Sequence, residues 1–130
     1  MRNDRTPRRL VVDEQTTYVW TVRHKHGDGD VCREVLSLHR DGVRTLIVFR
    51  AGEGRHVADG LQHSGSAADG RGNLINLREP RIVRALIDEA RERELLPGPR
   101  ELDGWTLFPA VISRAAAAIP AAPPGSLPGP

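Results

Sequence analysis

The sequence predicts an α+β fold of two layers, with an antiparallel sheet of about four to five strands and one main helix packed on one face. Short segments of alternating apolar and polar residues within 9–50 are typical of half-buried strands. Asp41-Gly42 stands between two apolar runs and is a strong hairpin signal. Residues 80–95 carry apolar side chains at helical spacing, which predicts a single helix with one apolar side.

The first fifty residues are expected to form a meander of strands. Residues 17–23 are the clearest strand, because aromatic and β-branched side chains alternate with polar ones there; those on one side are Tyr18, Trp20 and Val22. Glycines and aspartates within 26–30 favour a turn after this strand. The Asp41-Gly42 pair then divides the following residues into two more strands.

Both faces of this expected sheet are apolar. We assign one face to the helix, and it holds Tyr18, Trp20, Cys32, Leu36, Leu38, Leu46 and Val48. The opposite face then holds Val19, Val31, Val35, Val43, Ile47 and Phe49. Because so apolar a face is rarely left to solvent, we expect another surface to cover it.

The helix is expected to begin at Pro80, whose missing N–H is not needed at the first helical position. Its outer side mixes arginine with aspartate and glutamate, which favours a solvated surface over a phosphate-binding one. Pro97-Gly98-Pro99 should end the helix. A last short strand is expected at residues 105–108.

The domain organisation follows from composition. Residues 1–8 are expected to be a flexible basic arm, and residues 9–109 a single α+β domain in which 51–78 form a long glycine-rich loop. Residues 110–130 are rich in alanine and proline. They are expected to be a disordered tail, because they cannot bury enough apolar surface to offset their ordering entropy.

Composition excludes several classes of protein. The 130 residues include one cysteine, so a disulfide scaffold and a cysteine-rich zinc site are both excluded. We expect Cys32 to be a buried, inert thiol. No stretch reaches the ~20 apolar residues of a membrane-spanning helix, and no apolar segment follows the basic N-terminus. These features predict a cytoplasmic protein without membrane contact.

The charge is concentrated at the N-terminus. The whole chain has a formal net charge of +2, and residues 1–9 alone contribute +3, which leaves the other 121 residues at −1. We therefore treat the arginines of this segment as a candidate polyanion contact: Arg2, Arg5, Arg8 and Arg9. Nucleic acid is not an expected partner of the folded core.

His24 and His26 are candidate metal ligands. They stand two apart on or beside a strand, so their side chains should point to the same side. Imidazole suits zinc, which is the one cofactor that the sequence suggests. Spacing does not fix a third ligand, and the alternative is that these histidines are simply exposed at a polar strand end.

The order of motifs adds a resemblance. A Tyr18-x-Trp20-x-Val22-Arg23 strand, a helix opening at Pro80 and a Pro97-Gly98-Pro99 turn follow one another along the chain. In this the sequence resembles a group of small uncharacterised bacterial proteins from GC-rich genomes, over residues 9–109. The resemblance implies a compact α+β domain and no known activity.

These observations favour a non-catalytic protein-interaction or accessory domain over an enzyme. Its expected partner is another protein or a second copy of the chain, in a homodimer formed through sheet faces or edges. The first alternative is a metal-binding protein or small metal-dependent enzyme that uses His24 and His26, with residues 51–78 as a lid. The second alternative is weak nucleic-acid association through the N-terminal arginines.

Overall fold

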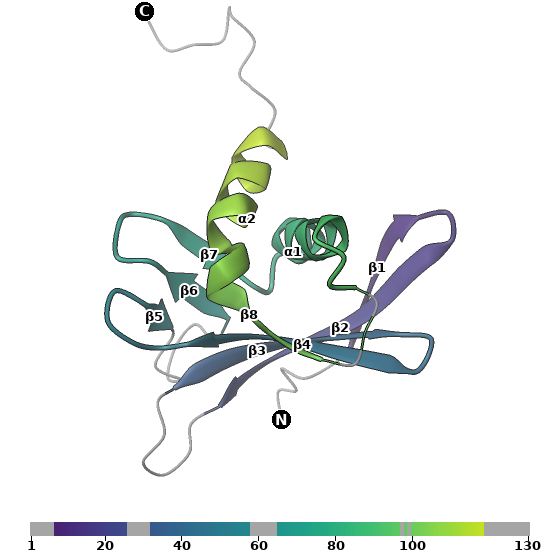
Figure 1. The fold of residues 1–130 in the computed structure, drawn as a ribbon, viewed down its shortest axis with the longest axis horizontal. Coiled ribbons are helices and arrows are strands. Elements are labelled where there is room, and N and C mark those ends of the chain that lie inside the picture. The colour runs from purple at the N-terminus through teal and green to yellow at the C-terminus, as the bar shows by residue number, and fades with distance from the viewer. Residues whose placement is uncertain (1–6, 26–31, 58–64, 97, 99, 119–130) are drawn as a thin grey trace, which may run out of the picture.

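A computed structural model describes residues 7–25, 32–57, 65–96, 98 and 100–118 (Figure 1). Its main sheet has five strands in the order β1-β2-β3-β4-β8. Their bounds are Arg8–Asp13 for β1, Thr16–Lys25 for β2, Arg33–Arg40 for β3, Val43–Arg50 for β4 and Glu101–Asp103 for β8. The first four strands form the expected antiparallel meander, but β8 pairs with β4 in parallel. The fold is therefore α+β with a mixed sheet, and the expectation of a purely antiparallel sheet is wrong.

Two helices, α1 (Pro80–Glu92) and α2 (Gly104–Ala118), lie on one side of this sheet, where we expected one main helix. Helix α1 lies over the sheet, and α2 starts at the sheet and rises away from it beside α1 (Figure 1). The expected strand at 105–108 is instead the start of α2. Asp103 caps the N-terminus of this helix, since its carboxylate accepts the backbone N–H of Trp105 at 3.0 Å. The helix then runs through residues 110–118, which we had assigned to the tail, and residues 119–130 lie outside the described residues.

The expected long loop contains a small sheet of its own. Its three antiparallel strands are β5 (His56–Val57), β6 (Ser66–Ala68) and β7 (Leu74–Asn76). It lies beside the main sheet, next to the start of α2 (Figure 1). Residues 58–64 of the segment lie outside the described residues.

The β3–β4 hairpin fixes which residues face the helices. Asp41 and Gly42 have φ values of 54° and 80°, the left-handed pair that a two-residue type I′ turn requires. The turn pairs Arg40 with Val43 and therefore Leu36 with Ile47. Ile47 and Phe49 consequently lie under the helices, fully buried, while Leu46 and Val48 turn to the other face. Our assignment of the two faces of this strand is wrong by one residue.

The helix layer packs closely on the sheet. Gly104, the first residue of α2, lies so near the Phe49 ring that a Cβ there would overlap it. Seven residues of α1 are buried: Ile82, Val83, Ala85, Leu86, Ile87, Glu89 and Ala90. In the part of the chain that the structure describes, neither helix combines the length and apolar character needed to cross a membrane.

Candidate functional site

His24 takes part in a buried pair on the helix side of the sheet. Its Nδ1 lies 2.5 Å from a carboxylate oxygen of Glu34, and the other oxygen of Glu34 accepts the backbone N–H of Gly65 at 2.8 Å. The side chain of Glu34 is fully buried, and this burial raises the pKa of its carboxyl group. The pair therefore joins β2 and β3 to the start of the small sheet.

The zinc hypothesis gains no further ligand from the described residues. Within them, no three or more His, Cys, Asp and Glu side chains are grouped as a metal would require. His26 lies outside the described residues. Among the described residues, the Nε2 of His24 has no hydrogen-bond partner, and this atom is buried.

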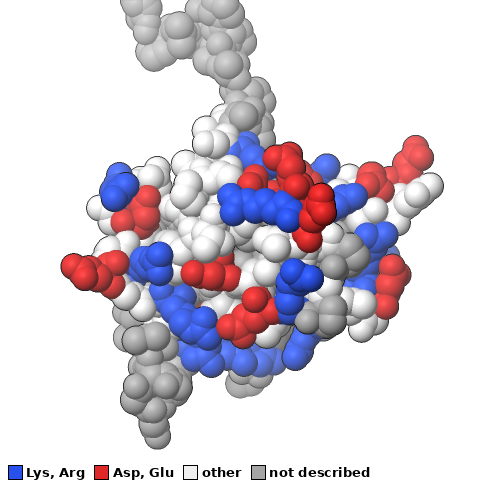
Figure 2. All heavy atoms as spheres, in the orientation of Figure 1, with Lys and Arg blue, Asp and Glu red and all other residues white. Residues whose placement is uncertain are grey.

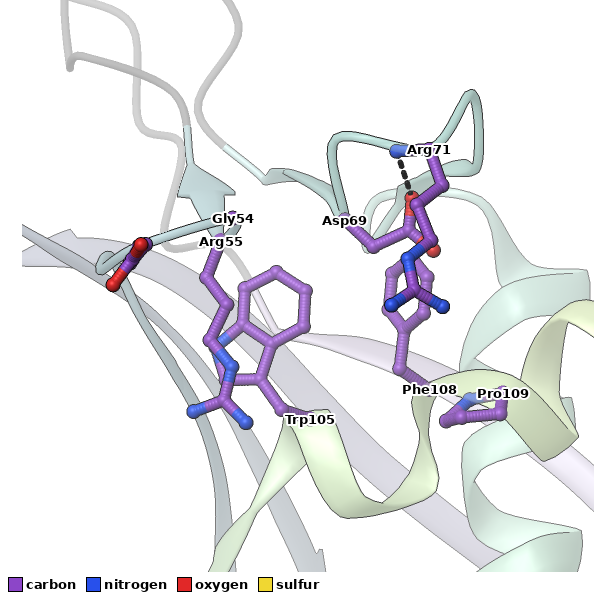
Figure 3. Close-up of a pocket in the computed structure, with 8 residues that line it drawn as sticks. Gly54, Arg55, Asp69, Arg71, Trp105, Phe108 and Pro109 are labelled. Carbon is purple, nitrogen blue, oxygen red and sulfur yellow. Dashed lines mark hydrogen bonds between the residues drawn. The ribbon is translucent and has the colours of Figure 1, made fainter.

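A hollow of about 320 Å³ lies between the small sheet and the start of α2 (Figure 3). Its lining includes the cations Arg55 and Arg71 and the acids Glu53 and Asp69, so its charges balance. Asp69 accepts hydrogen bonds from the side chain of Asn73 and the backbone N–H of Arg71, both at 2.8 Å, which lower its pKa. These bonds hold the carboxylate within its own loop.

The aromatic floor of the hollow is also occupied. The guanidinium of Arg55 lies 5.6 Å from the centre of the Trp105 ring, and Figure 3 shows it in front of that ring. Trp105 and Phe108 are only 7% and 3% exposed. The hollow therefore offers a ligand little free aromatic surface.

The face of the five-stranded sheet opposite the helices has a different character. Alternation along the strands places six cationic residues on it, which we call the arginine face: Arg9, Arg23, Lys25, Arg33, Arg44 and Arg50. Lys25 is paired with Arg33, and Arg33 with Arg50, so three cations form one row across β2, β3 and β4. The only acidic residues on the described strands of this face are Glu101 and Asp103 of β8.

The net charge of the described residues resides on this face. It carries six basic residues and two acidic ones, whereas the remaining described residues include eleven of each sign. In Figure 2, Lys and Arg gather along the lower edge, on the side of the sheet away from the helices. Blue and red are intermingled over the helices above.

The cations of the two sides also differ in their partners. On α1, Arg81, Arg84 and Arg91 each lie within ion-pair distance of a carboxylate. On the arginine face, Arg50 contacts Glu101 at 3.1 Å, and none of the other five has a carboxylate partner among the described residues. In the described part of the chain, this surface thus carries more cationic than acidic side chains, and five of its six cations have no carboxylate partner.

The arginines expected to form a polyanion contact are separated by the fold. Arg2 and Arg5 lie outside the described residues, while Arg8 and Arg9 are the first residues of β1. Arg8 points to the helix side, with its guanidinium 4.9 Å from the centre of the Trp20 ring, and only Arg9 belongs to the arginine face. Sequence reasoning missed the other five residues, although their alternation with buried positions was a usable signal.

Comparisons with known proteins give no relative. No family model matches the chain, and searches of curated proteins and of solved structures find no match. The resemblance to small bacterial α+β proteins therefore stays an expectation.

Proposed function

We propose that this protein is a non-catalytic binding protein whose arginine face engages an anionic macromolecule. The observation that carries the proposal is the accumulation of six cations, five of them without a carboxylate partner among the described residues, on one side of the sheet. Four of the six, Arg9, Arg23, Arg44 and Arg50, are exposed, and the other two are half-buried. Such a concentration of charge attracts and orients an anionic partner.

The row Lys25–Arg33–Arg50 supports this interpretation. Like charges directly opposite one another in a sheet are destabilising. Folding alone therefore gives no reason for such a row, whereas an anionic partner would supply the counter-charge that the strands lack.

A face-to-face homodimer, which the sequence suggested, is disfavoured by the same charges. Two copies of the arginine face would each present six cations against two acids. The apolar residues on this face are also fewer than we expected, because Ile47 and Phe49 lie under the helices, and Val35 and Val48 are 5% and 2% exposed. The partner we propose is therefore an anionic macromolecule of the cytoplasm and not a second copy of this face.

A binding role also fits the placement of the groups with catalytic potential. His24 and Glu34 are buried against each other, and Asp69 is occupied by its own loop. Neither the His24–Glu34 pair nor Asp69 directs a free general base toward the hollow.

The test is retention on immobilised heparin, a polyanion without bases or peptide. The triple variant Arg23→Gln, Arg33→Gln, Arg44→Gln should elute at much lower salt than the parent. The matched control is Arg81→Gln, Arg84→Gln, Arg91→Gln, which removes the same charge from α1 and should elute near the parent. Equal shifts in both triple variants, or no retention of the parent protein, would contradict the proposal. Melting temperatures verify folding, and the single variants Arg33→Gln and Arg84→Gln give the same comparison should a triple variant unfold.

A further inference from the structure

We infer that the anionic macromolecule is a double-stranded nucleic acid, held through its phosphate backbones and without contact to the base edges. This inference rests on the proposed function, because it assigns a partner to the arginine face. It is carried by the dimensions of the face, by the chemistry of its side chains and by the placement of the aromatic residues.

The cations lie at two ends of a broad surface. One end holds Arg9 and Arg44, in the row of His39, and the other holds the row Lys25–Arg33–Arg50. Arg9 on β1 and Arg44 on β4 are three strand spacings apart, which corresponds to about 14 Å. Along β3, Arg33 and His39 are six positions apart, a distance of about 20 Å. The major groove of a duplex is about 12 Å wide, so long arginine side chains at the two ends can reach the two backbones that border a groove. A single extended acidic segment would present its charges along one line, whereas the cations at each end of the face are spread across several strands.

The side chains suit phosphate. Five of the six cations are arginines, whose planar guanidinium binds phosphate oxygens through two parallel hydrogen bonds. Between the two ends, the same face carries Thr21 and Ser37, which are paired across β2 and β3. Hydroxyl groups in such positions are common donors to phosphate and sugar oxygens.

The bases would remain unread. The Tyr, Trp and Phe residues of the described strands, Tyr18, Trp20 and Phe49, all lie on the helix side. His39 is the one ring on the described part of the arginine face, so a row of unpaired bases has no series of rings on which to stack. The cations of the face are also spread over four strands, β1 to β4, whereas the major groove admits a helix or a two-stranded ribbon. The surface therefore fits the outside of a duplex better than a single strand or the floor of a groove.

The number of unpaired cations sets the expected salt dependence. Five cations without a carboxylate partner among the described residues predict about four to five neutralised phosphates, and a slope of log K against log salt of about −3.6 to −4.5. Each removed arginine should make this slope shallower by about 1. Between 50 and 200 mM salt, the affinity should fall by a factor on the order of several hundred.

The test is fluorescence anisotropy at several salt concentrations. The probes are two duplexes of about 20 base pairs with unrelated sequences, each as DNA and as RNA, together with one single strand of the same length and poly-glutamate. The proteins are the parent, Arg33→Gln, Arg44→Gln and the control Arg84→Gln, whose guanidinium is paired with Asp88 on α1. We expect equal affinity for the two sequences, weaker binding of the single strand, shallower slopes in the two face variants, and an unchanged slope in the control.

The outcomes separate the inference from the proposed function. Tighter binding of poly-glutamate than of duplex, with the same dependence on Arg33 and Arg44, would overturn the inference and leave the proposed function intact. A more than tenfold preference for one duplex sequence, or tighter binding of the single strand, would overturn contact through the backbones alone. If the face variants leave the binding of every probe unchanged, both the inference and the proposed function are contradicted.

Discussion

The helix layer and the arginine face use their charges in opposite ways. Glu89 of α1 accepts hydrogen bonds from Arg93 at 2.7 Å and from Arg114 of α2 at 2.9 Å, so its charge joins the two helices. Across the sheet, Arg33 lies directly between two other cations. Charges in the helix layer therefore hold the fold together, whereas five of the six cations on the arginine face have no carboxylate partner among the described residues.

The largest effect is expected at the buried His24–Glu34 pair, on the helix side of the sheet. Glu34→Ala removes the acceptor of the Gly65 N–H and the hydrogen-bond partner of the His24 ring, so two buried polar groups lose their partner. We expect a loss of about 3–5 kcal/mol in the free energy of unfolding, measured with urea. Glu34→Gln keeps an acceptor for Gly65 and should lose less. A loss below about 1 kcal/mol in Glu34→Ala would show that the pair is not structural.

The next effect comes from packing of α2 on the sheet. Gly104→Ala places a methyl group against the Phe49 ring and should lower the free energy of unfolding by about 2 kcal/mol. Gly52→Ala is the matched control, since a Cβ at Gly52 meets nothing within 4 Å. Chemical denaturation of both variants gives the comparison, and equal stabilities would contradict the close contact.

A smaller, pH-dependent effect is expected at the link between the helices. Glu89→Gln weakens the hydrogen bonds to Arg114 and Arg93 and should cost about 1 kcal/mol at pH 7. The same bonds hold the pKa of Glu89 below its usual value, so its contribution is present at neutral pH and is lost as the pH falls through that lowered pKa. Urea unfolding at pH 7 and pH 3 should show the difference between parent and variant shrinking in acid. A stability difference between parent and variant that is larger at pH 3 than at pH 7 would contradict the assigned direction of the pKa shift.

The smallest effect on stability is expected on the arginine face. Arg33→Gln removes a cation that faces Lys25 and Arg50, so the free energy of unfolding should change by less than about 0.5 kcal/mol, and toward greater stability at low salt. Arg93→Gln, which loses its contact with Glu89, should instead be less stable than the parent. A loss above about 1 kcal/mol in Arg33→Gln would mean that this face serves the fold.

Local patterns in the sequence predicted much of the fold. The alternation of Tyr18, Trp20 and Val22 placed the buried side of β2 correctly, and Pro80 marked the start of α1. The faces of β4 were misassigned because residues 46–49 are all apolar and do not alternate. Counting from the two-residue Asp41-Gly42 turn pairs Leu36 with Ile47 and would have resolved them.

The candidate site was harder to predict, for a physical reason. Summed along the chain, the charge of residues 10–130 is only −1. The fold instead sorts charge by side, because successive residues of a strand point to opposite faces. Arg23 and His24 are neighbours in sequence, yet one belongs to the arginine face and the other to the buried pair. The apolar run of residues 105–108 alone does not distinguish a strand from a helix. In the structure, Asp103 accepts the backbone N–H of Trp105, the second residue of α2.

The most direct test observes the arginine side chains themselves. In a titration of the folded protein with duplex nucleic acid, NMR would follow the Nε–Hε resonances of individual arginines. The resonances of Arg23, Arg33 and Arg44 should shift, while those of Arg84, Arg93 and Arg114 in the helix layer stay in place. Shifts in the helix layer with none on the arginine face would contradict the assignment of the binding surface.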